Sequence, residues 1–410
     1  MTIRRFTIRW PRSARQAKGH ATLLAVMMWA AAIAVGFIGT SNRGIAGPLK
    51  GADFVHFYTL GHLAHTHQIS TMYDMAALHE AQVALVPESK PDLYPAVYPP
   101  QIPAMFEPVH GWSYQRALFA WNLLTIAAYG FIVWSAWKPV SSVLPDRNLV
   151  IAAAAAFPPF WALVLYGQIT VLIVGAFWAG WLALERQRHF LAGVAFGLLA
   201  IKPQFGLPLA VIVLARRDWP MLTGAIVSVA LQSGAAWMML GSDAFRGFVS
   251  TLPITFGNVD LFESKPEFSH SLRVLTRLMP NAIGVPMWIG LVAIVLWYTA
   301  RVWRSDAPIR VRLGTVILAA VLVNPHLIIY DATVLVLPLI WFGAYVQEEP
   351  RQSIAPAYWK TVCWLFAALF VPTSAFIGVQ VSVLLMAWML VLIKRAALTS
   401  TTSEPALRAA

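Results

Sequence analysis

The stretch "LLAIKPQFGLP", residues 198–208, places Lys202 directly before a proline in the middle of a strongly apolar region. Pro203 removes a backbone donor and biases the preceding residue away from helical geometry, so a helix should break at Lys202. A charge at bilayer depth costs about 2.5–3.5 kcal/mol on insertion scales, and an ionisable residue in such a place is therefore a functional candidate. The stretch predicts a broken, partly re-entrant helix pair with Lys202 at its tip.

Composition places this break inside a membrane. Of the 410 residues, 59% are hydrophobic and 12% are charged, and long apolar runs recur from end to end. The runs are continuous rather than alternating, which favours helices over a barrel. The sequence therefore predicts an all-α polytopic membrane protein and excludes a soluble enzyme.

About 12 transmembrane or re-entrant helices are expected. The pair around Lys202 is short, about 12 residues or roughly 18 Å for each half, against a hydrocarbon core of about 30 Å. Merging the pair would move the downstream arginines to the outer side, which the positive-inside rule disfavours. The predicted spans are 21–39, 115–137, 148–166, 168–184, 190–201, 203–215, 219–240, 283–300, 313–328, 331–346, 360–375 and 377–393.

Charge predicts the orientation. About two thirds of the 30 Lys and Arg residues fall in segments that are cytoplasmic when the amino terminus is inside, so both termini should be cytoplasmic. The net charge of +12 lies in short loops, which argues against nucleic-acid binding and for contact with membrane lipids. We expect one membrane domain over 1–395 and a disordered cytoplasmic tail over 396–410.

Two long segments should face outward, at about 40–114 and 241–282. Residues 56–85 mix apolar and polar side chains at helical spacing, which predicts amphipathic helices at the membrane interface. The following "YPAVYPPQIP", residues 94–103, should form a rigid extended loop.

Histidines gather in the first outer segment. The spacing His62-x2-His65-x-His67 allows a metal cluster, but such sites usually add a carboxylate or cysteine at close spacing, and histidine also suits a membrane interface. We therefore expect no metal and no cofactor. The other two histidines of the segment are His56 and His79.

Polar candidates share the predicted outer side. Asp53 follows the first span and could equally be a helix cap, Gln168 could be a plain turn residue, and Lys202 could be a structurally paired charge. In "NPHLIIYD", residues 324–331, His326 and Tyr330 would share a helix face, whereas Asp331 would not unless the chain turns at Pro325.

The motifs in order, "GADFVHFY" (51–58), "YPP" (98–100), "YGQ" (166–168), "AGVAFGLLAIKPQ" (192–204) and "NPHLIIYD", resemble glycosyltransferase family 87 over about residues 20–350. The resemblance implies a GT-C fold in a bacterial inner membrane, with amphipathic helices and the active site on the periplasmic side. It also implies that a hexose, namely mannose, is transferred with inversion from a polyprenyl-phosphate donor to a lipid or glycan acceptor.

The resemblance also implies roles for residues. Asp53 matches the general base, and His326 lies in the turn expected to hold a second catalytic or donor-binding group. Lys202 would stabilise the phosphate leaving group. The chain departs from mycobacterial members, which look more like a Ser-Pro-x-Ser-Trp pattern. The remaining predicted donor-binding residues are Gln168, Tyr166, Tyr98, Tyr330 and Asp331.

Two other functions fit the composition. A secondary transporter of a small polar or anionic substrate also uses broken helices and buried charges, but usually shows internal repeats, and the Lys202–Pro203 break has no second copy. A non-catalytic membrane scaffold would tolerate replacement of Asp53 or Lys202.

Overall fold

The computed structural model describes residues 14–34, 38, 41–44, 47–94, 97–257, 269–277, 279–348 and 351–399. Within these ranges the chain is helical and has no β-strand; two isolated bridges, Arg43 with Leu49 and Ser269 with Ile328, are the only β pairings. The all-α prediction is confirmed. The basic leader, residues 258–268 of the second outer segment and the tail beyond residue 399 lie outside the described residues.

Several helices are long and apolar enough to cross a membrane. The described residues contain four, α5 (Tyr114–Trp137), α11 (Trp219–Gly257), α14 (Asn281–Trp303) and α19 (Val381–Thr399). A fifth span forms if α6 (Arg147–Ala155) and α7 (Pro158–Tyr166), bent by 48° at their junction, count as one. Of the other predicted spans, α1 (Ala14–Ala32) has 19 residues but is not among these four, and the rest are shorter helices, so the total of about 12 stays a prediction.

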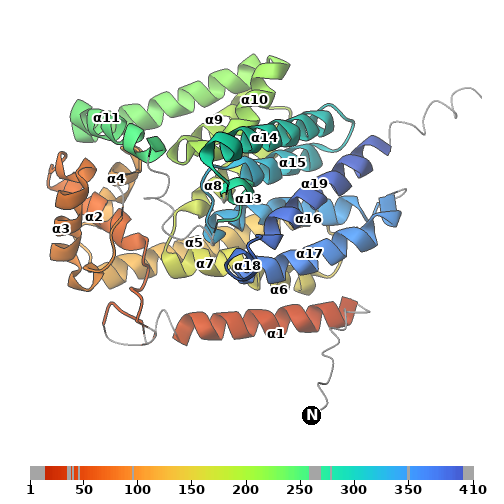
Figure 1. Ribbon diagram of the computed structural model, residues 1–410, viewed down its shortest axis with the longest axis horizontal. Helices are drawn as coiled ribbons and strands as arrows, with labels where there is room; N and C mark the ends of the chain where they lie inside the picture. The colour runs from red at the N-terminus through yellow and green to blue at the C-terminus, as the bar shows by residue number, and fades with distance from the viewer. Residues whose placement is uncertain are drawn as a thin grey trace, which may run out of the picture.

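The shorter apolar helices fill the interior. α15 (Ile309–Val323) is almost entirely buried and packs against α8 (Thr170–Glu185), α14, α16 (Val336–Tyr345) and α19. Figure 1 shows α15 and α16 running through the middle of the helix bundle, with α17 (Ala355–Phe370) and the short α18 (Thr373–Ile377) beside them. A helix that is apolar on every side is stable only when buried in protein or lipid.

The helix break at Lys202 is confirmed. α9 (His189–Gly197) continues as a 3-10 turn to Ile201, and a second 3-10 turn, Pro203–Phe205, precedes α10 (Leu207–Arg216). Lys202 itself has φ −139° and ψ 74°, outside the helical region. α9 is fixed by very close packing on α11: a Cβ at Gly193 would lie 1.9 Å from the carbonyl oxygen of Met221.

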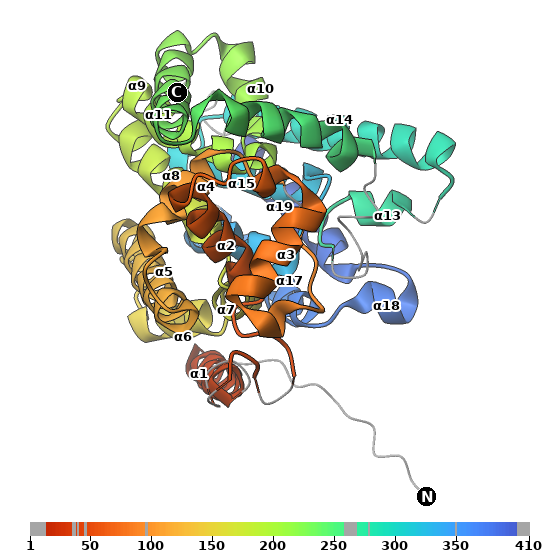
Figure 2. The same ribbon diagram turned by 90° about the vertical axis from the view of Figure 1, so that its left-hand side faces the viewer.

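The predicted first outer segment forms a compact unit at one end of the molecule (Figures 1 and 2). It contains α2 (Phe54–His65), α3 (Met75–Leu85) and α4 (Gln101–Phe106), with a 3-10 turn, Glu107–Val109, after α4. The prediction of surface amphipathic helices is wrong for α2, whose residues are nearly all buried, because α4 covers it. α3 buries one face, at Leu78 and Gln82.

The predicted extended loop at 94–103 ends in a helix, and its residues 95 and 96 lie outside the described residues. Helix α4 begins at Gln101, directly after Pro100, and contains Pro103 in its first turn. Proline is tolerated there because the first amides of a helix have no intrahelical acceptor.

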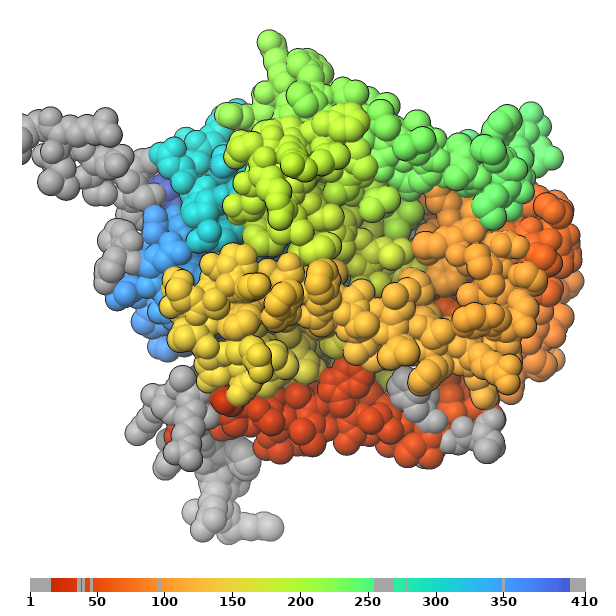
Figure 3. Space-filling view, turned by 180° about the vertical axis from the view of Figure 1, so that it is seen from behind, coloured from red at the N-terminus to blue at the C-terminus, as the bar shows by residue number. Residues whose placement is uncertain are grey.

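Helix α1 (Ala14–Ala32) lies along the edge of the bundle against α6 and α7 (Figure 3). The indole nitrogens of Trp161 and Trp29 donate to the carbonyl oxygens of Met28, at 2.7 Å, and Ala155, at 2.9 Å. The helix begins before the predicted residue 21, and most of the predicted end, up to residue 39, lies outside the described residues.

Candidate functional site

Four chain breaks meet at one place. Asp53 precedes α2, Gln168 follows α7, Lys202 separates the two 3-10 turns, and Asp331 lies in the 3-10 helix Ile329–Leu335. The backbone N–H of Asp53 donates to the carbonyl oxygen of Tyr166 at 3.0 Å and joins the start of α2 to the end of α7. Backbone N–H and C=O groups at a helix break lack their intrahelical partners and need other polar groups nearby. The four breaks therefore lie together with polar side chains around them.

The Asp53 carboxylate is held by neutral groups. Gln168 Nε2 donates to Asp53 Oδ2 at 2.8 Å, and the Tyr330 hydroxyl donates to the same carboxylate. Burial raises the pKa of Asp53 to about 6, although both hydrogen bonds and the charge of Lys202 lower it. Asp53 makes no side-chain cap to α2, so the capping alternative is wrong. A carboxylate with this pKa can accept a proton near neutral pH.

Lys202 forms a buried ion pair with Asp331. The two side chains are 6% and 4% exposed, and Lys202 Nζ lies 2.7 Å from Asp331 Oδ1. Lys202 Nζ also donates to Thr170 Oγ1 at 3.2 Å and to Gln168 Oε1 at 3.4 Å. Because an ammonium has three N–H groups, these partners use all of its donors.

Thr170 was missed by the sequence reasoning. Its hydroxyl donates to Asp331 Oδ1 at 2.5 Å while accepting from Lys202. The available signal was its position two residues after Gln168, at the amino terminus of α8.

Gln168 connects the two carboxylates. Its amide nitrogen binds Asp53, and its oxygen accepts from Lys202 and from the backbone N–H of Ile169 at 3.1 Å. The preceding Gly167 has φ +66°, and a Cβ there would lie 2.6 Å from Cβ of Phe54. A left-handed residue without a side chain is therefore needed to place Gln168 beside α2.

Aromatic rings surround these polar groups. Lys202 Nζ lies 5.3 Å from the centroid of the Tyr330 ring, and Tyr166, 41% exposed, has its ring 5.6 Å from that of Tyr330. The Tyr98 hydroxyl accepts from Gln168 Nε2 at 3.3 Å. The structure thus brings together Tyr98, Tyr166, Gln168, Lys202, Tyr330 and Asp331 around Asp53.

His326 lies at the edge of this cluster. Its partly buried ring is within electrostatic range of Asp331, Lys202 and Asp53, and burial lowers its pKa. The segment before Tyr330 is not helical: the chain turns at Pro325, and Ile328 pairs with Ser269. A helix face shared by His326 and Tyr330 is therefore wrong, and the turn is what lets Asp331 reach Lys202.

His56 is a second residue whose place in the site was not predicted. It lies on α2 one turn after Asp53, is 2% exposed, and its ring is 5.9 Å from Tyr94 and 5.6 Å from Tyr98. Neither ring nitrogen has a hydrogen-bond partner within the described part of the chain. Burial lowers its pKa to about 4, so the ring is neutral at physiological pH.

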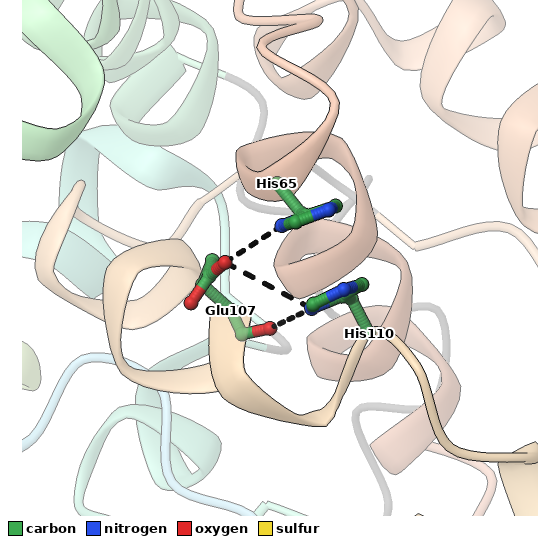
Figure 4. Close-up of side chains that lie close together, drawn as sticks. All are labelled: His65, Glu107 and His110. Carbon is green, nitrogen blue, oxygen red and sulfur yellow. Dashed lines mark hydrogen bonds and ion pairs between the residues drawn. The ribbon is translucent and has the colours of Figure 1, made fainter.

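The histidine cluster that the spacing allowed, His62 with His65 and His67, is not what the structure brings together. His65 lies beside Glu107 and His110, as Figure 4 shows, whereas His67 is exposed on a left-handed turn after α2. The sequence could not predict this group because Glu107 lies 42 residues after His65.

The fold and the cluster define a helical membrane protein with a buried polar site in which one carboxylate, Asp53, has a raised pKa. The family model of glycosyltransferase family 87 matches residues 96–325, more than half of the sequence. The chain therefore belongs to this family. No curated protein and no solved structure matches the chain. The family makes the chain a glycosyltransferase, and the transporter alternative is not supported.

The matched range is narrower than the resemblance suggested. It includes Tyr98, Tyr166, Gln168 and Lys202, but begins after Asp53 and ends just before His326. The assignment of Asp53 therefore depends on its geometry in this structure.

Proposed function

We propose that the protein transfers the hexose mannose from a polyprenyl-phosphate donor to a hydroxyl group of a lipid or glycan acceptor. The transfer inverts the configuration at the anomeric carbon. The proposal includes a GT-C arrangement of about 12 membrane or re-entrant helices in a bacterial inner membrane. Both termini face the cytoplasm, and the Asp53 cluster faces the periplasm with the helices of the first outer segment.

The contrast between two neighbouring carboxylates carries the proposal. Asp331 accepts from the Lys202 ammonium, whereas Asp53 accepts from the neutral Gln168 and Tyr330 side chains. Two carboxylates in different environments can serve different roles. The pKa of Asp53, raised by burial to about 6, suits a general base.

The reaction follows from this assignment. Asp53 removes the proton from the acceptor hydroxyl as that oxygen attacks the anomeric carbon. The new carbon–oxygen bond forms on one face of the sugar while the bond to the phosphate oxygen breaks on the other, and its electron pair leaves with the polyprenyl phosphate. The proton remains on Asp53 until solvent removes it.

Lys202 has a different role from the simple phosphate contact expected from the sequence. Its charge is balanced by Asp331, and its three N–H groups are already bonded. We infer that Lys202 holds Asp331 and Gln168 in place, and through Gln168 orients Asp53. Direct contact with the leaving phosphate would require Lys202 to give up one of these bonds.

Arg277 is a further cation for the donor phosphate. It lies at the end of α13 (Arg273–Arg277), within electrostatic range of His326. Arginine binds phosphate oxygens through two parallel hydrogen bonds. His326 and Arg277 together form the proposed donor side, and the exposed ring of Tyr166 offers a surface for stacking the sugar.

His56 marks the proposed acceptor side. The His56 ring is neutral, packs beside Tyr94 and Tyr98 one helical turn from Asp53, and finds no hydrogen-bond partner for its nitrogens among the described residues. A buried polar group without a partner costs roughly 1–3 kcal/mol, which an acceptor hydroxyl can recover by hydrogen bonding.

Sugar transfer from synthetic polyprenyl-phosphate mannose by purified protein in nanodiscs tests the proposal. Wild type is compared with Asp53→Asn, Lys202→Ala and His326→Ala, with and without chelator. We expect Asp53→Asn to fold and to lose transfer. Absence of transfer and of hydrolysis by wild type across a panel of lipid-phosphate sugars would overturn the proposed donor class.

A further inference from the structure

Two histidines and one glutamate meet at the far end of α2 from Asp53. His65 is the last residue of α2, Glu107 begins the 3-10 turn after α4, and His110 follows that turn. Nδ1 of His65 lies 2.8 Å from Glu107 Oε1, and Nδ1 of His110 lies 3.8 Å from the same oxygen (Figure 4). One ligand atom from each residue falls within 4.8 Å of the other two.

These separations match a zinc coordination shell. Zinc binds histidine nitrogen and carboxylate oxygen at about 2.0–2.2 Å in a tetrahedron, which places neighbouring ligand atoms roughly 3.3–3.5 Å apart. The observed 2.8 and 3.8 Å lie on either side of that spacing. The two imidazole rings would have to tilt out of their parallel arrangement to bring their in-plane nitrogen lone pairs onto one ion.

The two imidazole rings are unusually close. Their centroids are 3.3 Å apart with an angle of 9° between the planes, and both rings address one carboxylate. A divalent cation placed here would attract the carboxylate and both ring nitrogens at once.

His110 would exchange one partner on binding a metal. Its Nδ1 now lies 2.9 Å from the backbone carbonyl oxygen of Glu107. Coordination through Nδ1 requires the neutral tautomer with its proton on Nε2, so this contact would be given up for the bond to the metal.

A change of rotamer would be needed for His62 to complete the shell, because it is not part of the group whose ligand atoms lie within 4.8 Å of one another. It lies one turn before His65 on α2, and its Nδ1 is buried without a hydrogen-bond partner in the described ranges. Burial lowers the pKa of His62, and so do the charges of His110 and His65, which shows that the three rings lie within electrostatic range. A neutral imidazole is the form that binds metal.

We propose that His65, Glu107 and His110 form a Zn²⁺ site, with His62 or a water molecule as the fourth ligand. The site lies about 18 Å from Asp53, the length of the 12-residue helix α2 at about 1.5 Å per residue. It therefore takes no part in sugar transfer. It fixes the end of α2 to the turn after α4, and α4 in turn follows the segment that carries Tyr98.

Zinc binding to the full-length protein in nanodiscs tests this site. The protein is prepared without a polyhistidine tag, stripped with chelator and titrated with Zn²⁺ in a calorimeter, with Mg²⁺ in parallel. We expect one Zn²⁺ to bind per chain and no Mg²⁺ to bind. X-ray absorption spectra at the zinc edge should show a coordination shell of nitrogen and oxygen atoms. Binding should be at least about 100-fold weaker in His65→Gln/His110→Gln and at least about 10-fold weaker in Glu107→Gln.

His20→Gln/His67→Asn is the matched control, because it removes the same number of histidines, both exposed, and asparagine tolerates the left-handed backbone of His67. It should bind Zn²⁺ as wild type does. The site is overturned if stripped wild type binds no Zn²⁺ or if Glu107→Gln binds as tightly as wild type. Glu107→Gln keeps the side-chain size, so it decides the question even if the double variant fails to fold. Zinc binding and sugar transfer are measured separately, so either can fail alone.

Discussion

Lys202 Nζ lies 2.7 Å from Oδ1 of Asp331, a residue 129 positions later in the chain. The pair joins the helix break after α9 to the 3-10 turn before α16, and both side chains are buried. Two parts of the fold that carry no regular helix are thus fixed to each other through a charge pair. Thr170 and Gln168 bond to the same ammonium, so this contact also holds those two side chains.

Breaking the pair from one side should be costly. Lys202→Met leaves a buried carboxylate without its cation, and Asp331→Asn leaves a buried ammonium without its anion, each costing about 3–5 kcal/mol of unfolding free energy. The double variant Lys202→Met/Asp331→Asn should cost less than the sum of the two. Thermal or detergent unfolding of all four proteins measures the coupling, and additive losses would show that the pair is not energetically linked.

Replacing Asp53 should separate activity from stability. Asp53→Asn keeps the side-chain volume but cannot accept a proton, so the rate of sugar transfer should fall about 10²–10⁴-fold. Because burial disfavours the ionised carboxylate, the variant should melt at or above the wild-type temperature at pH 7.5. Loss of activity accompanied by a lower melting temperature would indicate a structural role for Asp53. Asp92→Asn, in the same outer segment, provides a control at another acid.

The raised pKa of Asp53 predicts two opposite pH trends. Below about pH 6 the protonated acid cannot act as a base, so kcat/KM should fall about tenfold for each pH unit. The folded protein binds this proton more tightly than the unfolded chain, whose pKa is near 3.8, so the stabilising contribution is complete below pH 3.8 and is lost as the pH rises through 6. Rate and melting profiles of wild type and Asp53→Asn between pH 4.5 and 8 check both trends, and the variant should lack them.

Arg277 should affect donor binding. Arg277→Ala removes a cation near His326, so KM for the polyprenyl-phosphate donor should rise about tenfold or more while KM for the acceptor stays constant. Arg273→Ala is the matched control on the same helix, because Arg273 stacks over Trp288 at 5.9 Å. Equal effects of the two substitutions on donor KM would argue for general electrostatics rather than a specific phosphate contact.

A methyl group at position 167 should disturb the site through the backbone. Gly167→Ala introduces a Cβ 2.6 Å from Phe54 Cβ at a residue with φ +66°, so we expect a loss of about 1–3 kcal/mol and reduced transfer as Gln168 moves. Gly130→Ala on α5 meets no atom within 4 Å and should be neutral or slightly stabilising. Melting temperatures and transfer rates of both variants test this prediction. If Gly167→Ala melts and reacts as wild type does, glycine is not required at this position.

Much of the architecture could be predicted from the sequence. Continuous apolar runs predicted the helices, and the Lys202–Pro203 dipeptide predicted a break that the structure contains. Proline acts on its immediate neighbours, so its effect is readable locally. The ordered motifs also indicated the family to which the chain belongs. By contrast, the burial of α2 depends on α4 packing over it, and no local periodicity reports a distant partner.

The candidate site shows the same division. Sequence alone selected Asp53, Gln168, Lys202 and Asp331, because polar residues in an apolar chain must have partners or functions. Only the tertiary structure decided the partners of each side chain. Lys202 pairs with Asp331 and donates to Thr170, whereas Asp53 accepts hydrogen bonds from neutral side chains. Local effects, such as the helix break at a proline, depend on neighbouring residues in the sequence. A pKa and an ion pair depend instead on distances between residues far apart in the chain, which are set by packing.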